Sequence, residues 1–325
     1  MNSADTPGIS AVRLAVTTAL IDGDPGTAFH LVRNLMDQGL SFDAVLFDVI
    51  AAAHADFGTR WKAGDYRIAD EHAATGAVET LVAMLAGSFD LPEAGEHVVV
   101  AAAEGDQHSL PGRLASAHLL ALGYRVRYLG SNMEAVDLAG YLSEEAPAAL
   151  VLSCAMPTLL PGARASIRAA HAAGVPVLAG GPGFGPDGVW AYTIGADAWV
   201  ATPREIHDVL TSWEPDPEVA ERVVPTPPAE LDVIDRHRQE VLAAVEVRLG
   251  DAPRRLRSEA DLLLGAVEAT LLVGDPEVLS EFLAWQTSLL SSHGFAEETA
   301  TEVRQAVAAG LHDLAPGAAD LLSHP

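Results

Sequence analysis

The sequence predicts a multidomain chain: a helical bundle, then a domain built on a parallel sheet, then an all-helical C-terminal domain. Three observations predict it. Apolar residues recur at helical spacing at both ends of the chain, short β-rich runs alternate with helical stretches in the middle, and a proline-rich stretch precedes the last part. A chain of 325 residues is long enough for two or three such domains.

The first part, residues 8–90, is predicted to form a four-helix bundle. Apolar side chains such as Leu31 and Leu35 are spaced to share one helix face. Asp24 and Ser41 each precede an apolar helical pattern, as capping residues do. Helices are expected near 8–21, 25–38, 42–58 and 69–87.

The pattern changes in residues 96–210, where strands and helices are expected to alternate. The β-rich runs lie at 97–103, 124–129, 148–153, 175–179 and 197–201, with helical stretches between them near 112–122, 133–145, 160–173 and 187–194. Such alternation indicates βαβ units, so a Rossmann-like α/β parallel sheet is predicted. Ligands of these sheets bind outside the carboxyl ends of the strands.

A proline-rich segment separates the sheet domain from the end of the chain. Five prolines fall within residues 211–228, which predicts a linker. Residues 229–325 return to helical spacing and are predicted to form an all-α domain, with apolar stripes near 231–249, 257–273, 276–293 and 297–314.

Composition excludes several classes of partner. The 45 acidic residues outnumber the 19 basic ones, giving a net charge of −26, which argues against nucleic acid and anionic membranes. No apolar run reaches the roughly 18–20 residues that cross a bilayer. No signal peptide is visible, and Cys154 is the only cysteine, so we expect a cytoplasmic protein without an intrachain disulfide.

Polar residues and glycines follow three of the expected strands. Asp106 and His108 come after the first, Ser153 ends the third, and the pair Gly180-Gly181 follows the fourth. A carboxylate two residues before a histidine can hold one ring nitrogen and aim the other at a metal. Because these strand ends meet at one edge of a parallel sheet, the residues are predicted to form one binding site.

This pattern resembles the cobalamin-binding domain of methionine synthase and its relatives. The resemblance implies that His108 is the lower ligand of cobalt, oriented by Asp106. It also implies that the nucleotide tail of the cofactor lies in a slot lined by Ser153, Gly180 and Gly181. The family usually has a glycine three residues after the histidine; here Pro111 holds that place and Gly112 follows, where it would let the loop approach the corrin.

A second pattern lies in the expected bundle. Trp61 is followed, after nine residues, by Glu71-His72. This spacing resembles that of light-sensing cobalamin proteins, in which the bundle covers the upper face of the corrin. The resemblance implies adenosylcobalamin as the cofactor, with Trp61 packed over the adenosyl group and Glu71 and His72 in contact with it. An aromatic plane there would exclude water from the cobalt–carbon bond.

The order of the parts resembles that of the photocobilins, which combine cobalamin with a bilin. This resemblance implies that residues 229–325 bind biliverdin. No cysteine lies in that range, so the attachment would be non-covalent. Phe282, Trp285 and His293 are the candidate bilin-binding residues, and the arginines near 254–257 could pair with its propionates.

The predicted function is therefore a light sensor rather than an enzyme, in which photolysis of the cobalt–carbon bond moves the bundle. A homodimer or higher homo-oligomer is expected, with an unknown downstream signalling partner. Two alternatives stay open. One is a corrinoid carrier subunit for methyl transfer, which would work with methyltransferases. The other is a light-independent cobalamin sensor.

Overall fold

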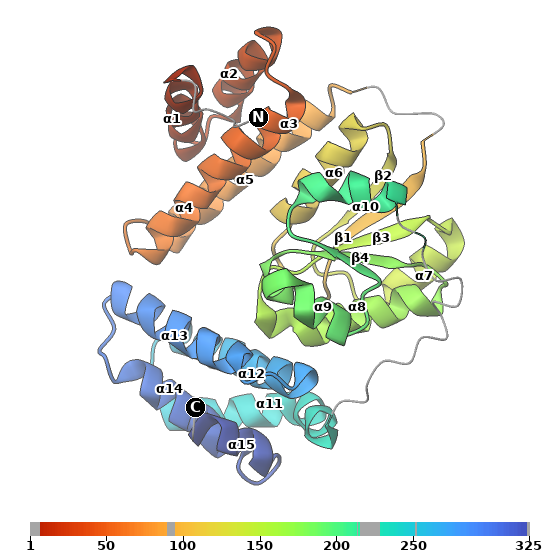
Figure 1. Cartoon of the computed structure of the whole chain (residues 1–325). Coiled ribbons are helices and arrows are strands. Elements are labelled where there is room, and N and C mark those ends of the chain that lie inside the picture. Colours follow the sequence, from red (N-terminus) through yellow and green to blue (C-terminus); the bar gives the residue numbers. More distant parts are fainter. Residues whose placement is uncertain (1–6, 90–94, 213, 215–227, 251, 324–325) are drawn as a thin grey trace.

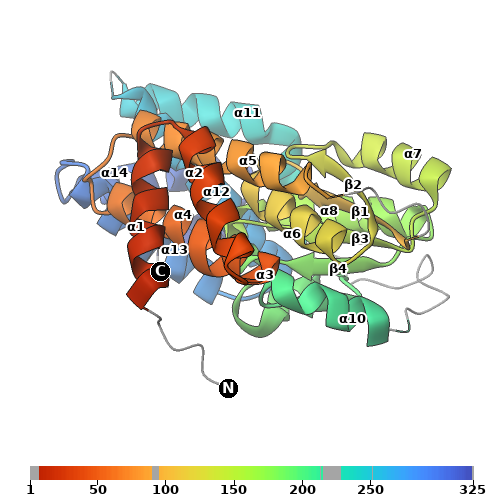
Figure 2. The same cartoon turned by 90° about the horizontal axis from the view of Figure 1, so that it is seen from above.

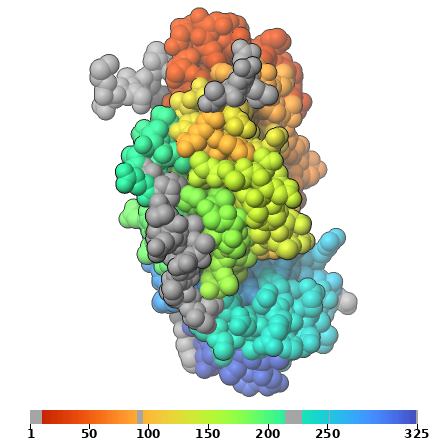
Figure 3. Space-filling model, turned by 90° about the vertical axis from the view of Figure 1, so that its right-hand side faces the viewer, coloured from red at the N-terminus to blue at the C-terminus, as the bar shows by residue number. Residues whose placement is uncertain are grey.

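A computed structural model describes residues 7–89, 95–212, 214, 228–250 and 252–323. Within them, a helical bundle, a sheet domain and a C-terminal helical domain follow one another along the chain, and Figure 3 shows them stacked in that order. The predicted fold class is confirmed. No helix within the described ranges has both the length and the hydropathy needed to span a bilayer.

The bundle consists of α1 (Pro7–Ile21), α2 (Pro25–Asp37), α3 (Phe42–Ala44), α4 (Ala52–Lys62) and α5 (Ile68–Ala86). Both expected caps are present: the Asp24 carboxylate accepts from the backbone N–H of Thr27 at 2.9 Å, and the Ser41 hydroxyl accepts from that of Ala44 at 3.1 Å. The core is apolar, with residues such as Phe57 buried between the helices.

The third helix differs from the prediction in its centre. A π-helical segment, Val45–Ala51, joins α3 to α4, where the sequence predicted an uninterrupted α-helix over 42–58. π-Helical turns are uncommon and often lie at functional sites. Apolar periodicity does not reveal such a turn, because one extra residue changes the helix face without changing its composition.

The sheet has five parallel strands in the order β2-β1-β3-β4-β5. They are β1 (His97–Ala102), β2 (Arg125–Gly130), β3 (Ala149–Ser153), β4 (Val177–Gly180) and β5 (Ala198–Val200). The register pairs Ser153 with Ala102 on one side and with Gly180 on the other. The expected carboxyl edge therefore forms as predicted.

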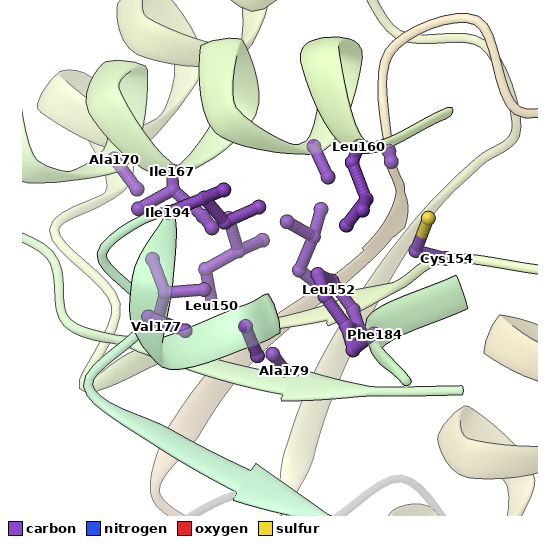
Figure 4. Close-up of a cluster of buried hydrophobic side chains, with 14 of the residues drawn as sticks. Leu150, Leu152, Cys154, Leu160, Ile167, Ala170, Val177, Ala179, Phe184 and Ile194 are labelled. Atoms are coloured by element: carbon purple, nitrogen blue, oxygen red, sulfur yellow. The ribbon is translucent and has the colours of Figure 1, made fainter. Parts of the chain in front are cut away.

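Helices cover both faces of this sheet, as expected for a doubly wound domain. They are α6 (Leu110–Ala121), α7 (Ala135–Glu145), α8 (Leu160–Ala172), α9 (Val189–Thr193) and α10 (Ile206–Ser212). Figure 4 shows one core layer, in which Leu150 and Leu152 of β3 face Ile167 of α8. The predicted linker, 211–228, lies almost wholly outside the described residues, and its first two residues belong to α10.

The C-terminal domain contains α11 (Ala229–Leu249), α12 (Arg254–Val273), α13 (Glu277–Ser292), α14 (Thr299–Leu311) and α15 (Pro316–Ser323). It has its own apolar core, in which Phe282 is 6% exposed. It also shares a core with the sheet domain, because Ala269 of α12 and Val278 of α13 belong to the apolar cluster under the sheet. Figures 1 and 2 show α12 and α13 extending from the sheet domain towards the tip of the bundle.

Candidate functional site

The loop after β1 presents His108 on a fixed carboxylate. Asp106 is fully buried, and its Oδ1 lies 2.7 Å from His108 Nδ1 and accepts from the His108 backbone N–H at 2.9 Å. Its Oδ2 accepts from the backbone N–H of Ala155 at 2.9 Å, which joins the loop after β1 to the loop after β3. The His108 side chain itself is 54% exposed. Nε2 is thus the ring nitrogen left for a ligand.

The electrostatic environment of His108 favours the protonated form of its ring. The hydrogen bond to Asp106 raises the pKa of His108 above its ordinary value; burial opposes that shift, and the carboxylate of Glu71 adds to it. A carboxylate-bound histidine is more basic and is held in one tautomer, which makes it a better metal ligand once it has lost its proton. These residues therefore fit the predicted role of His108, which stays a prediction.

A cavity of about 270 Å³ opens beside this loop between the bundle and the sheet domain. Its sheet-domain wall includes Gly112, Ser153 and Gly180, together with Gly181. Its bundle wall is formed by Phe47, Ala51 and His54, which come from the π-helical segment and α4. Of the residues that the sequence grouped, Ser153, Gly180 and Gly181 line this slot, whereas Asp106 and His108 lie outside its lining, on the loop beside it.

The slot fits the flat part of a ligand. Among the described residues, the buried Ser153 Oγ has no hydrogen-bond partner, so it is free to bond a group placed in the slot. A Cβ on Gly112 would lie 3.0 Å from Tyr128 Cε2. A Cβ on Gly181, whose φ is +108°, would lie 2.5 Å from the Cys154 carbonyl oxygen. The close backbone approach at Gly181 therefore requires glycine.

The bundle presents a hydrogen-bonded chain of polar groups near His108. His54 Nε2 lies 3.0 Å from Thr75 Oγ1, and that hydroxyl donates to Glu71 Oε1 at 2.8 Å. The other Glu71 oxygen lies 2.9 Å from His72 Nδ1. Burial lowers the pKa of His54, while the charge of Glu71 opposes that shift and that of His108 adds to it. Glu71 is thus held in place close to the site, and His72 is more exposed.

Trp61 lies at the far end of α4, next to the C-terminal domain. Its ring centroid is 5.7 Å from that of His293, the residue after α13. It does not line the slot. The structure therefore brings Glu71 to the histidine site and places Trp61 at a junction between domains. The predicted contacts of Trp61, Glu71 and His72 with an adenosyl group stay predictions.

Sequence reasoning missed His54 and Glu79. His54 lies seven residues before Trp61, two helical turns along one face, which was a usable signal. Glu79 of α5 accepts a hydrogen bond from the hydroxyl of Ser109, the residue after His108. Tyr128 also donates to the Ser109 carbonyl, at 2.5 Å. These long-range contacts leave no periodic trace in the sequence.

The aromatic residues predicted for a bilin are part of the C-terminal core. The rings of Phe282 and Trp285 pack 5.5 Å apart in a tilted arrangement. Their apolar neighbours are those of the domain itself. A separate cleft of about 440 Å³ lies between α11 and α12, and its lining includes Arg254 and Arg257 rather than the aromatic pair.

Comparison with known families shows what kind of cofactor the chain binds. Residues 96–207 match a family model described as a B12 binding domain, and residues 13–86 match a second model with the same description. The chain is a cobalamin-binding protein. The two matches cover the bundle and the sheet domain, and the slot lies between these two parts. Both matches end before the C-terminal helical domain of this cobalamin-binding protein.

Similar proteins are corrinoid proteins. A corrinoid protein of Desulfitobacterium hafniense (strain Y51) is 26% identical over 194 residues, which is 57% of this chain and 88% of the relative. The monomethylamine corrinoid protein of Methanosarcina barkeri has a similar fold, with a TM-score of 0.51 and 18% identity over 60% of this chain and 94% of that one. A cobalamin-binding protein of Desulfitobacterium hafniense DCB-2 has 22% identity over 62% of this chain and 98% of that chain, with a TM-score of 0.34.

Proposed function

We propose that this cobalamin-binding protein is a light sensor that holds adenosylcobalamin, and that it is not an enzyme. The observation that carries the proposal is the position of Glu71. Thr75 and His72 fix this carboxylate on the bundle, and its charge acts on His108 at the sheet edge. The bundle thus has a polar group close to the proposed lower ligand, and the spacing of Trp61, Glu71 and His72 supports a bundle that covers an adenosyl group.

Each part of the chain has a role in this proposal. His108 would ligate cobalt from below, and the slot beside Ser153 and Gly180 would hold the nucleotide tail. Bound adenosylcobalamin supplies a cobalt–carbon bond that light can break. Glu71 would bond the nucleoside while Trp61 excludes water, so loss of that group would remove their contacts and shift the bundle between two states.

A corrinoid carrier for methyl transfer is the second candidate. The names of the relatives favour it more directly than they favour light sensing, since they are corrinoid proteins, one of them named a monomethylamine corrinoid protein. A carrier would bind methylcobalamin and would expose it to a separate methyltransferase. A light-independent cobalamin sensor would need neither the methyl group nor the light.

One experiment separates these functions. The full chain is loaded in the dark with adenosylcobalamin or methylcobalamin, and its absorption spectrum and its small-angle scattering are measured before and after green and red light. Light also cleaves free alkylcobalamins, so the deciding readout is the shape of the protein. A light-dependent shape change with the adenosyl form supports the sensor. Photolysis without any shape change contradicts it. Transfer of the methyl group from the methylcobalamin-loaded protein to an acceptor, catalysed by an added methyltransferase, would then establish the carrier, and no transfer would leave the light-independent sensor.

We further propose that the C-terminal domain binds biliverdin without a covalent bond. The order of the parts supports this. So does the cleft lined by Arg254 and Arg257, whose guanidinium groups suit two propionates; Glu246 and Asp261 line it as well, and a propionate would compete with Glu246 for Arg257. Protein purified from cells that make biliverdin should absorb red light. Denaturation in acid urea should release all the pigment, and a fluorescent protein band on a zinc-stained gel would contradict the non-covalent attachment. The homo-oligomer and the cytoplasmic location stay predictions.

A further inference from the structure

Helices α12 and α13 are fixed to the sheet domain at one end. Ala269 and Val278 are buried in the core under the sheet. At Gly265, a Cβ would lie 2.9 Å from the carbonyl oxygen of Thr158, so α12 packs directly on the turn that follows β3. The Trp190 Nε1–H donates to Asp275 Oδ2 at 2.9 Å. Buried apolar side chains, a close backbone approach and a hydrogen bond thus attach the two helices to the sheet domain. The two helices and the sheet domain are therefore expected to move together.

At the other end of this helix pair, the end of α13 contacts the bundle through one hydrogen bond, one ring contact and a close backbone approach. The Ser292 hydroxyl lies 2.7 Å from the Lys62 carbonyl oxygen and 2.9 Å from that of Leu289 in its own helix, and its one proton serves the shorter contact to Lys62. The ring of His293 packs on that of Trp61. Gly64, in the turn between α4 and α5, lies so close to Ser292 that a Cβ there would come within 2.5 Å of its carbonyl oxygen. Figure 1 shows this turn beside the end of α13. Few groups take part, so this end is the one that can open.

The narrowness of the slot indicates that the bundle moves when cobalamin enters. The slot holds about 270 Å³ and is walled on one side by the bundle residues Phe47, Ala51 and His54. Sites for much smaller ligands measure roughly 300–1,000 Å³. A corrin ring with its tail is larger than such a ligand, so the slot has to widen to admit it, and we expect the bundle to separate from the sheet domain during entry and release.

We propose that α12 and α13 form a latch that acts beside the direct apolar contact of the bundle with Leu110 and Leu114 of α6, helps to hold the bundle against the sheet domain, and limits the rates at which cobalamin enters and leaves. This assigns a role to a domain that lies beyond both matched family regions. The junction at Lys62, Gly64 and Ser292 is the part that opens. The inference goes beyond light sensing and does not depend on it, because only cobalamin binding is required.

The test measures binding and release of hydroxocobalamin by the full chain, in the dark, by stopped-flow absorbance. Ser292→Ala removes the bond to Lys62, and Gly64→Ala pushes the junction apart. Ser291→Ala is the control for the first, since Ser291 is the exposed neighbour. Gly23→Ala is the control for the second. Gly23 has a positive φ of +71°, similar to the +84° of Gly64, but no atom lies within 4 Å of a Cβ added there.

Ser292→Ala should raise both the association rate and the dissociation rate by about fivefold, since one hydrogen bond contributes on the order of 1 kcal/mol. Gly64→Ala should raise both rates by at least as much, and the two controls should match the unaltered protein. The dissociation constant should change little because both rates rise together. Unchanged rates in both latch variants would overturn the proposal, as would a faster release with unchanged association. The two proposals can fail separately. If the rates change as expected but light causes no change of shape, the light-sensor proposal is wrong and the latch proposal stands.

Discussion

Asp106 Oδ1 lies 2.7 Å from His108 Nδ1, while the other oxygen of the same carboxylate accepts from the Ala155 backbone N–H. One buried group therefore connects the loops after two neighbouring strands. Because this carboxylate is bonded to both loops, it holds the ring of His108 in a fixed orientation relative to the sheet. The Nε2 atom of His108 lies on the side of the ring away from the contact between Nδ1 and Asp106. The affinity of Nε2 for a ligand should therefore depend on the charge and the position of the Asp106 carboxylate.

Asp106→Asn should weaken cobalamin binding by about 10- to 100-fold, the usual cost of removing the partner of a metal-bound histidine. The amide keeps the shape but removes the charge that makes His108 basic. Binding is measured by absorbance titration with hydroxocobalamin. Asp137→Asn, at an exposed position, is the control. Equal affinities for the two variants would show that the Asp106 charge has no effect on the ligand.

His108→Ala should leave the fold intact and should abolish the absorption spectrum of histidine-ligated cobalamin. The side chain is half exposed, so its loss removes little packing. Circular dichroism checks the fold, and His312→Ala, another exposed histidine, is the control. A His108→Ala variant that binds cobalamin with an unchanged spectrum would exclude His108 as the lower ligand.

Gly181→Ala should weaken binding of cobalamin far more than binding of a corrinoid that lacks the nucleotide tail. The added Cβ meets the Cys154 carbonyl oxygen at 2.5 Å and distorts the slot wall. Gly174→Ala is the control because Gly174 has a φ of +71° and open space around it. Comparable losses for both corrinoids would mean that Gly181 shapes the domain as a whole instead of the tail slot.

Trp61→Ala should weaken retention of adenosylcobalamin more than that of hydroxocobalamin if the ring encloses the adenosyl group. The same substitution removes the contact with His293, which affects both cofactors alike. The ratio of the two dissociation rates therefore isolates the adenosyl contact. An unchanged ratio would limit Trp61 to the junction between the bundle and the C-terminal domain.

The unfolding midpoint of the cofactor-free protein in urea should fall as the pH drops below about 6.5, the ordinary pKa of histidine. Burial lowers the pKa of His118; the charges of Arg204 and His207 add to the decrease and Asp43 opposes it. The unfolded chain then binds more protons, so stability decreases on acidification, by up to about 1.4 kcal/mol per pH unit for one proton. His118→Gln should make stability depend less on pH. Part of the pH dependence should remain in this variant, because the pKa of His54 is also lowered. An identical pH dependence in the variant would contradict the assignment.

Much of the fold and part of the site could be predicted from the sequence. Alternation of β-rich and helical runs predicted the parallel sheet, and parallel strands bring their carboxyl ends to one edge. That rule alone places Asp106, Ser153 and Gly180 at one edge of the sheet, and the strand register agrees with it. The π-helical turn at 45–51 was missed because its signal is a change of helix face.

What the sequence by itself determined is the set of local elements and the residues at the strand ends, because periodicity and strand order follow from short-range rules. Only the tertiary structure decided which separate parts meet. His54 lines the slot, Glu79 contacts the loop of His108, and Trp61 contacts His293. These contacts join residues that are far apart in the chain, and they depend on how packed surfaces fit together. No spacing rule along the chain encodes that fit.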